Sequence, residues 1–221
     1  MSVSVEQFID IIQDDQVIIV DTRSSEAILE GYIPNAIHAP KHQLGKLIAM
    51  GLLNLDSPIA LVCDKGAEDE TEMVFNKLGF KNIKAVLENG FEAWMNANNK
   101  FDLAIDVDID ELAMDLPFDE FLMVLDVRNE DLYHQGHIKN SVHIPLVELA
   151  DVGSMSELDE HFNIYIISDN GEDAFVAATL LKKQGIHNNR IVNGGWESVL
   201  MLKEKFTIEQ SKPRPKMEEE E

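Results

Sequence analysis

The chain of 221 residues contains a single cysteine, Cys63, so it cannot form a disulfide within itself. Its apolar runs all fall far short of the roughly 18 residues that a membrane-spanning helix requires. Its first residues show neither the basic segment nor the apolar segment of a signal peptide. These absences predict a protein of the reducing cytoplasm with no membrane partner.

Positive charge is also scarce. Lys and Arg number 18 against 41 Asp and Glu, which gives a formal net charge of −23. Such a chain repels phosphate backbones and anionic lipid surfaces, which argues against nucleic acid as a partner. The seven histidines and the one cysteine lack the spacing of metal ligands, so we predict no metal and no cofactor.

The sequence contains an internal repeat, in which its second half resembles its first half. The segment DTRSSEAILEGYIPNAIHAP, from Asp21 to Pro40, returns 105 residues later as DVRNEDLYHQGHIKNSVHIP, from Asp126 to Pro145. Downstream, CDKG at 63–66 stands opposite SDNG, and NGFEAW stands opposite GGWESV. A period of this length is typical of a duplicated domain.

The limits of the two copies divide the chain into three parts. We predict a first domain over 1–100 and a second over 101–205, with the connection near 99–107. The remaining segment, 206–221, alternates prolines with charge and ends in four glutamates. Because it offers little apolar surface to bury, we expect this tail to be disordered.

Within each copy, short apolar runs alternate with amphipathic stretches. Runs such as VIIV at 17–20 and IYII at 164–167 are typical of strands buried on both faces of a parallel sheet. TEMVFNKLGF at 71–80 and AFVAATLLKKQGI at 174–186 have helical spacing and close on a glycine. The pattern predicts an α/β fold of two domains, each a central, mainly parallel sheet flanked by helices.

Two helix starts carry the spacing of a capping box. They are Ser4 with Gln7, and Asp108 with Glu111.

The repeated Asp-x-Arg segment predicts structural pairs. We expect Arg23 and Arg128 to pair with carboxylates and hold a strand end, and His38 and His143 to bond to the backbone rather than take part in chemistry.

The order of these motifs resembles that of rhodanese-like domains. The shared features are Asp-x-Arg, a glycine ten residues after that aspartate, the phrase YIPNAIHAP or HIKNSVHIP, a strand ending in a cysteine with a Cys-x-x-Gly loop, a helix ending in LGF, and a closing NGFEAW or GGW. The resemblance runs from residue 4 to about 203, in two copies, and indicates a tandem protein of this family. It implies a sulfurtransferase, in which a cysteine takes up a sulfane sulfur as a persulfide and passes it to cyanide or a protein thiol.

The resemblance assigns the chemistry to the first domain. Cys63 stands at the catalytic position, and the loop after it would bind the substrate: Asp64, Lys65, Gly66, Ala67 and Glu68. Ser168 has no sulfur and stands at the matching position, so the second loop is predicted to be degenerate: Ser168, Asp169, Asn170, Gly171, Glu172 and Asp173. The implied partners are a small sulfur donor and a protein thiol acceptor, and the sequence does not indicate the oligomeric state.

Two departures from the family pattern bear on the first site. Glu68 stands where many active members have an arginine, and Asp173 stands there in the second copy. The spacing from Cys63 to Gly79 is 16 residues, against 17 from Ser168 to Gly185, which predicts a first loop that is one residue short.

The residues of the first loop have opposite effects on the charge state of Cys63. Backbone N–H groups and the positive end of the following helix favour a thiolate at Cys63. A carboxylate about 6 Å from that thiolate would cost more than the helix end returns. The outcome depends on whether Glu68, Asp69 and Glu70 face inward. Acidic residues in a first helical turn also stabilise the helix without any chemical role, and a lone cysteine is often a small buried hydrophobe.

Three other functions compete with sulfur transfer. The paired domains could form a catalytically silent binding or regulatory module, consistent with two acidic loops and one missing cysteine. Cysteine phosphatase or arsenate reductase chemistry needs an arginine at the loop end, where this chain has acids. Redox sensing through Cys63 would need a thiol from another molecule.

Overall fold

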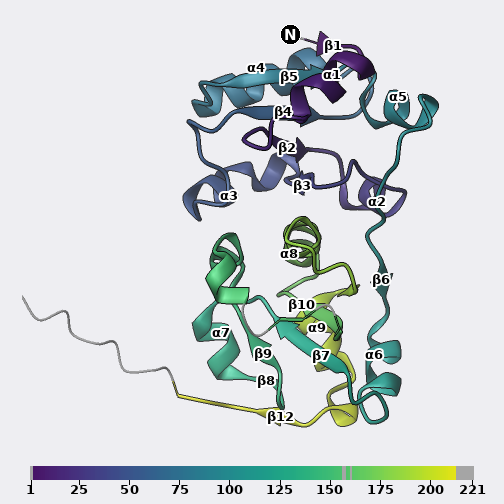
Figure 1. The fold of residues 1–221 in the computed structure, drawn as a ribbon. Helices are drawn as coiled ribbons and strands as arrows, with labels where there is room; N and C mark the ends of the chain where they lie inside the picture. Colours follow the sequence, from purple (N-terminus) through teal and green to yellow (C-terminus); the bar gives the residue numbers. More distant parts are fainter. Residues whose placement is uncertain (1, 156–157, 160, 213–221) are drawn as a thin grey trace, which may run out of the picture.

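The computed structural model describes residues 2–155, 158–159 and 161–212. It contains two five-stranded sheets and a two-stranded pair. Helices cover both five-stranded sheets (Figure 1). The prediction of two α/β domains with mainly parallel sheets is confirmed.

The first domain is built on strands in the order β1-β5-β4-β2-β3, all parallel. Its strands are β1 (Ser2–Val3), β2 (Ile18–Asp21), β3 (Ile37–His38), β4 (Ile59–Val62) and β5 (Ile83–Leu87). Its helices are α1 (Val5–Ile12), α2 (Ser25–Leu29), α3 (Leu44–Ala49), α4 (Glu68–Leu78) and α5 (Gly90–Asn96), with the 3₁₀ turn η1 (Lys41–Gln43). β4 is buried along its whole length, as its continuous apolar run predicts.

The second domain repeats this order as β6-β11-β10-β7-β9, again all parallel. Its strands are β6 (Asp106–Val107), β7 (Leu122–Asp126), β8 (His137–Ile138), β9 (Val142–His143), β10 (Asn163–Ile167), β11 (Asn189–Val192) and β12 (Ile208–Glu209). Its helices are α6 (Ile109–Asp115), α7 (Glu130–Gln135), α8 (Glu172–Lys183) and α9 (Gly195–Met201), with 3₁₀ turns η2 (Leu146–Ala150), η3 (Val152–Met155) and η4 (Lys203–Lys205). The matching strand order is the structural counterpart of the repeated motifs.

One of the two predicted capping boxes forms. Ser4 accepts from the N–H of Gln7, and the Gln7 side chain accepts from the N–H of Ser4. Asp108 does begin α6, but its side chain makes no capping bond there. It accepts a bond from Asn193 at 3.4 Å instead, which turns the carboxylate toward β11.

The start of the predicted tail is ordered. Ile208–Glu209 forms β12, which pairs antiparallel with β8. Phe206 is buried and Ile208 packs against the core of the second domain. These two apolar residues therefore hold in place the start of a segment that was predicted from its charge to be disordered. The rest of the predicted tail, 213–221, lies outside the described residues. The predicted connection is shorter as well, because residues 106–107 already form the edge strand β6.

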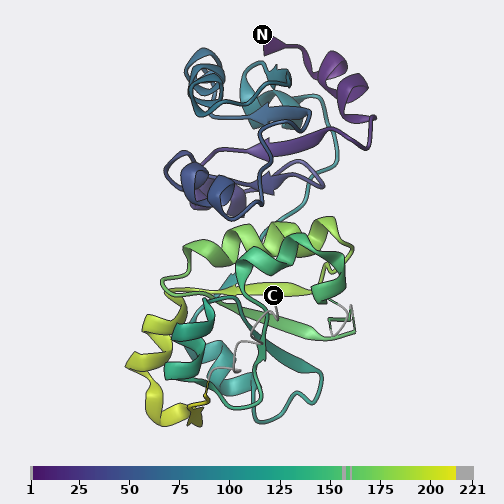
Figure 2. The same ribbon diagram turned by 90° about the vertical axis from the view of Figure 1, so that its left-hand side faces the viewer.

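Helix α8 lies between the two domains (Figures 1 and 2). Its residues 174–181 are all buried, and one apolar core runs through it from the first domain into the second. The Thr179 hydroxyl accepts a bond from the N–H of His38 at 3.0 Å, which joins α8 to β3. The helix that follows the degenerate second loop is therefore the main contact between the domains.

Candidate functional site

Cys63 directly follows β4, the middle strand of the first sheet, and Cys63 is only 1% exposed. Residues 64–67 form a tight turn, in which the N–H of Ala67 bonds to the carbonyl of Asp64 at 3.0 Å. Gly66 has a φ of +83°, which suits glycine. The thiol thus sits at the carboxyl end of a buried strand, just before the start of α4.

The closing motif of each domain packs directly against its loop. A Cβ added to Gly90 would lie 2.1 Å from the carbonyl oxygen of Cys63, and Gly90 has a φ of +56°. Gly195 has the same role in the second domain, with a distance of 2.2 Å to the carbonyl of Ser168. Only glycine fits at either place, which explains why NGF and GGW recur.

The surroundings of Cys63 favour the neutral thiol. Burial raises its pKa to about 11, and the carboxylates of Glu68 and Asp64 act in the same direction. The Thr71 hydroxyl and the Lys41 ammonium work to lower it. The start of α4 was expected to stabilise a thiolate, but with a pKa of about 11 Cys63 is a neutral thiol at neutral pH.

Of the three acids that open α4, only Glu68 turns back onto the loop. Its Oε1 accepts from the N–H of Asn89 at 2.8 Å. Burial works to raise the pKa of Glu68, but hydrogen bonds from the N–H groups of Glu68, Gly66 and Asn89 hold it below its usual value. Asp69 is exposed, and Glu70 pairs with Lys41 at 3.3 Å.

Two residues near Cys63 were missed by the sequence analysis. Thr71 is fully buried, and its hydroxyl makes no well-formed hydrogen bond among the described residues, but it lies close enough to the Cys63 thiol to lower the pKa of that thiol. Lys41 follows the repeated His-x-Pro phrase and supplies a positive charge to the site. At an offset of 105 residues the second copy has Leu146 and Val176, so a comparison of the copies could have revealed both positions.

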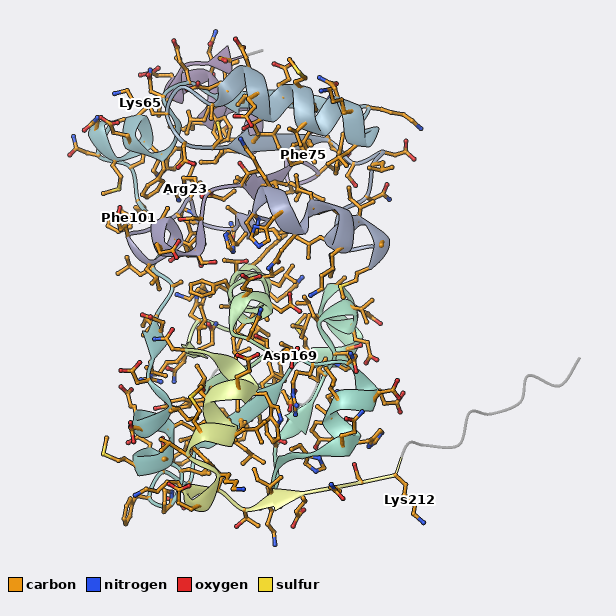
Figure 3. All side chains as sticks on the ribbon, turned by 180° about the vertical axis from the view of Figure 1, so that it is seen from behind. Arg23, Lys65, Phe75, Phe101, Asp169 and Lys212 are labelled. Carbon is orange, nitrogen blue, oxygen red and sulfur yellow. The ribbon has the colours of Figure 1, made fainter. Side chains whose placement is uncertain are left out.

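Lys65 lies away from the thiol. Its ammonium pairs with Glu92 of α5 at 3.2 Å, with both side chains more than half exposed. Figure 3 shows the two loops, marked by Lys65 and Asp169, in separate domains. The first loop is therefore a site of its own and does not share residues with the second.

The polar groups of the second loop form hydrogen bonds within the loop and with residues of the first domain. The Ser168 hydroxyl accepts from the N–H of Gly171 at 3.0 Å, and Asn170 accepts from the N–H of Glu172. Glu172 accepts from Gln43 at 3.1 Å, and Asp173 binds the ammonium of Lys46 at 2.6 Å. These two acids join the domains.

The repeated arginines and histidines have the predicted structural roles. Arg23 binds Asp21 through two nitrogens, and Arg128 binds Asp126 in the same way, all four residues being buried.

Each histidine ring contacts the backbone of the arginine in its own copy. Nε2 of His38 lies 3.0 Å from the carbonyl of Arg23, and Nε2 of His143 lies 2.9 Å from that of Arg128. Each set fastens the end of a strand, β2 or β7, next to its loop.

The first loop is not the shorter one, contrary to the prediction. Four residues separate Cys63 from α4, whereas three separate Ser168 from α8. The difference lies after the loop, since α4 has 11 residues and ends directly before Gly79, whereas α8 has 12 and Gln184 stands between it and Gly185. Counting to the closing glycine cannot tell a shorter loop from a shorter helix.

Within the described residues, no group of three or more His, Cys, Asp or Glu side chains is arranged to hold a metal ion. No helix in that part of the chain is long and apolar enough to cross a membrane.

Comparison with known proteins shows which family the chain resembles. The family model "Rhodanese-like domain" matches the chain twice, over residues 4–97 and 109–201. "Putative sulfur carrier protein YrkF" of Bacillus subtilis is 41% identical over 75 residues, which cover 34% of this chain and 38% of that protein. "Thiosulfate sulfurtransferase GlpE" of Pseudomonas putida is 29% identical over 90 residues, or 40% of this chain and 79% of that one. A crystal structure of a thiosulfate sulfurtransferase from Pseudomonas aeruginosa is 17% identical with a TM-score of 0.41, covering 97% of this chain and 44% of that one.

Proposed function

The chain belongs to the rhodanese-like domain family, and from this premise we propose that it is a sulfurtransferase that carries sulfane sulfur as a persulfide on Cys63. The Cys63 thiol loses its proton to water, and the thiolate attacks the outer sulfur of a donor. The donor's S–S bond breaks, its electron pair leaves with the donor remnant, and Cys63 holds the sulfur. An acceptor thiolate then attacks that sulfur and restores the Cys63 thiolate.

The observation that carries this proposal is the buried, unpartnered hydroxyl of Thr71 beside the Cys63 thiol. A buried polar group without a partner costs about 1 to 3 kcal/mol, so a sulfur anion that accepts its hydrogen bond would be stabilised there. A hydroxyl donor suits an anionic sulfur on Cys63, and Lys41 adds positive charge from the neighbouring η1 turn. The second domain has no sulfur at Ser168 and acts as a scaffold.

The partners follow from the chemistry of the step. The donor is a small sulfane-sulfur compound or a persulfide, and the acceptor is a thiol, including one on a protein. A lone cysteine that must stay reduced between turnovers suits a reducing compartment such as the cytoplasm.

A second candidate function is a catalytically silent binding or regulatory module. The observation that favours it is the raised pKa of Cys63, at about 11, together with the Glu68 carboxylate folded over the loop. In that case neither loop carries sulfur, and the joined domains serve as a binding unit.

A turnover assay separates the two functions. Purified protein is given thiosulfate or glutathione persulfide, with cyanide or a thiol as acceptor, and the transferred sulfur is measured. We expect turnover with at least one donor, its loss in Cys63→Ser, and its retention in Ser168→Ala. Equal background activity in all three proteins would contradict sulfur transfer and favour the binding module.

A further inference from the structure

The carboxylate of Glu68 folds back over the first loop toward backbone N–H groups. Its Oε1 accepts from the N–H of Asn89 at 2.8 Å, and the N–H groups of Gly66 and Glu68 lie near enough to help lower its pKa. Such N–H groups at the start of a helix are the donors that a bound anion uses. A side chain of the protein therefore holds the place where the anionic part of a substrate would bind.

The second copy shows that this arrangement is not a general result of an acidic first turn. Asp173 stands at the matching position, but it extends to Lys46 of the first domain. The N–H of Gly171 donates to the Ser168 hydroxyl rather than to a carboxylate. Only Glu68 folds back over its own loop, and it does so in the loop that has the cysteine.

We propose that Glu68 determines the donor specificity of the first loop, rejecting oxyanion donors such as thiosulfate and admitting persulfides. This inference rests on the proposed function, because it names the substrate class of the same site.

The two donor classes differ in what they require of the loop. Thiosulfate gives its outer sulfur to Cys63 and releases sulfite, so its sulfonate oxygens need N–H donors while the S–S bond breaks. Glu68 takes the N–H of Asn89 beside the loop and adds a like charge there. A persulfide, R–S–SH, releases a thiolate that takes up a proton from water, and it has no oxyanion group on the S–S bond that breaks.

The test measures the rate of sulfur loading on Cys63 by intact mass in the full-length protein, with thiosulfate and with glutathione persulfide. The variants are Glu68→Ala, which empties the loop, and Glu68→Gln, which keeps the shape and the acceptor but removes the charge. Asp69→Asn is the matched control, because it removes the same charge from the next residue, which is exposed. The ratio of the two rates is compared, because a change in the pKa of Cys63 alters both rates together.

We expect the ratio of thiosulfate to persulfide loading to rise about tenfold or more in Glu68→Ala, by less in Glu68→Gln, and to stay within about twofold in Asp69→Asn. An unchanged ratio in proteins that load from glutathione persulfide would overturn the inference and leave the proposed function intact. A rise of the same size in Asp69→Asn would also overturn it, because overall charge would then be the cause. Failure of every variant to load from either donor would overturn both. Glu68→Gln, which keeps the hydrogen-bond acceptor, carries the test if Glu68→Ala does not fold.

Discussion

At the residue scale, the state of Cys63 is set by opposed neighbours. Burial and the carboxylates of Glu68 and Asp64 favour the thiol, whereas Thr71 and Lys41 favour the thiolate. Cys63 was predictable as the candidate nucleophile because its place in the motif order is distinctive. The direction of Glu68 was not predictable, because it depends on a hydrogen bond to Asn89, 21 residues away. Thr71 was missed because a threonine in a helix does not by itself indicate that it faces a cysteine, and only its replacement by Val176 in the second copy marks the position.

The raised pKa of Cys63 predicts how its alkylation depends on pH. Only the thiolate reacts, so the rate with iodoacetamide should climb about tenfold per pH unit and level off near pH 11. Thr71→Val should move this curve to higher pH, because it removes a group that lowers the pKa of Cys63. Thr71→Ser keeps the hydroxyl and should leave the curve near that of the wild type.

Stability gives an independent check on Thr71. Valine replaces an unpartnered buried hydroxyl by a methyl group, so the free energy of unfolding should stay the same or rise by about 1 kcal/mol. A residue that only filled space would leave the alkylation curve of Thr71→Val unchanged, and that result would contradict the role given to Thr71.

At the element scale, the glycines of the closing motifs fix α5 and α9 against their loops. The Cβ positions at Gly90 and Gly195 fall on the carbonyl oxygens of Cys63 and Ser168. The order of the longer elements was predictable, because continuous apolar runs and helical spacing identify them locally. The two-residue strand β12 was missed because so short a strand has no periodicity. The capping bond of Asp108 was predicted wrongly, because Asn193 competes for its carboxylate.

Substitution of these two glycines should separate stability from chemistry. Gly90→Ala and Gly195→Ala should each destabilise the protein by about 2 to 4 kcal/mol, because the new Cβ meets backbone and φ is positive. Urea unfolding measures this loss for both. In the fraction that remains folded, sulfur loading should be impaired only in Gly90→Ala. Loss of loading to the same degree in Gly195→Ala would contradict a single working loop.

At the scale of the whole molecule, the duplicated domains differ in their loops. The first keeps a cysteine in its loop, and the second uses its loop acids and α8 to hold the first. The duplication was predictable from the repeat. The burial of α8 was predictable, because AFVAATLL is apolar on all sides of the helix. The pattern does not identify which part of the protein packs against it.

The shared core predicts that both domains unfold together. Trp94 and Trp196 are the only tryptophans and lie in different domains, so Trp94→Phe and Trp196→Phe each leave one fluorescent reporter. In each variant, fluorescence and circular dichroism should give the same urea midpoint. Midpoints that differ between the two signals would contradict one cooperative unit.

The contact between α8 and β3 can be weakened at one atom. Thr179→Val should lower the free energy of unfolding of the whole molecule by about 1 to 3 kcal/mol, because the N–H of His38 loses its buried partner. Urea unfolding measures the change. Thr207→Val, at an exposed position, should change it by less than about 0.5 kcal/mol. Equal effects of the two substitutions would contradict a structural role for the Thr179 bond.

The central claim is that Cys63 carries sulfur, and intact-protein mass spectrometry tests it most directly. The protein is incubated with glutathione persulfide, freed of the donor and weighed before and after reduction. We predict a gain of one sulfur, about 32 Da, that a reductant removes and that is absent from Cys63→Ser. A protein that gains no mass, while its thiol is still alkylated by iodoacetamide, would contradict sulfur transfer and leave a folded binding module.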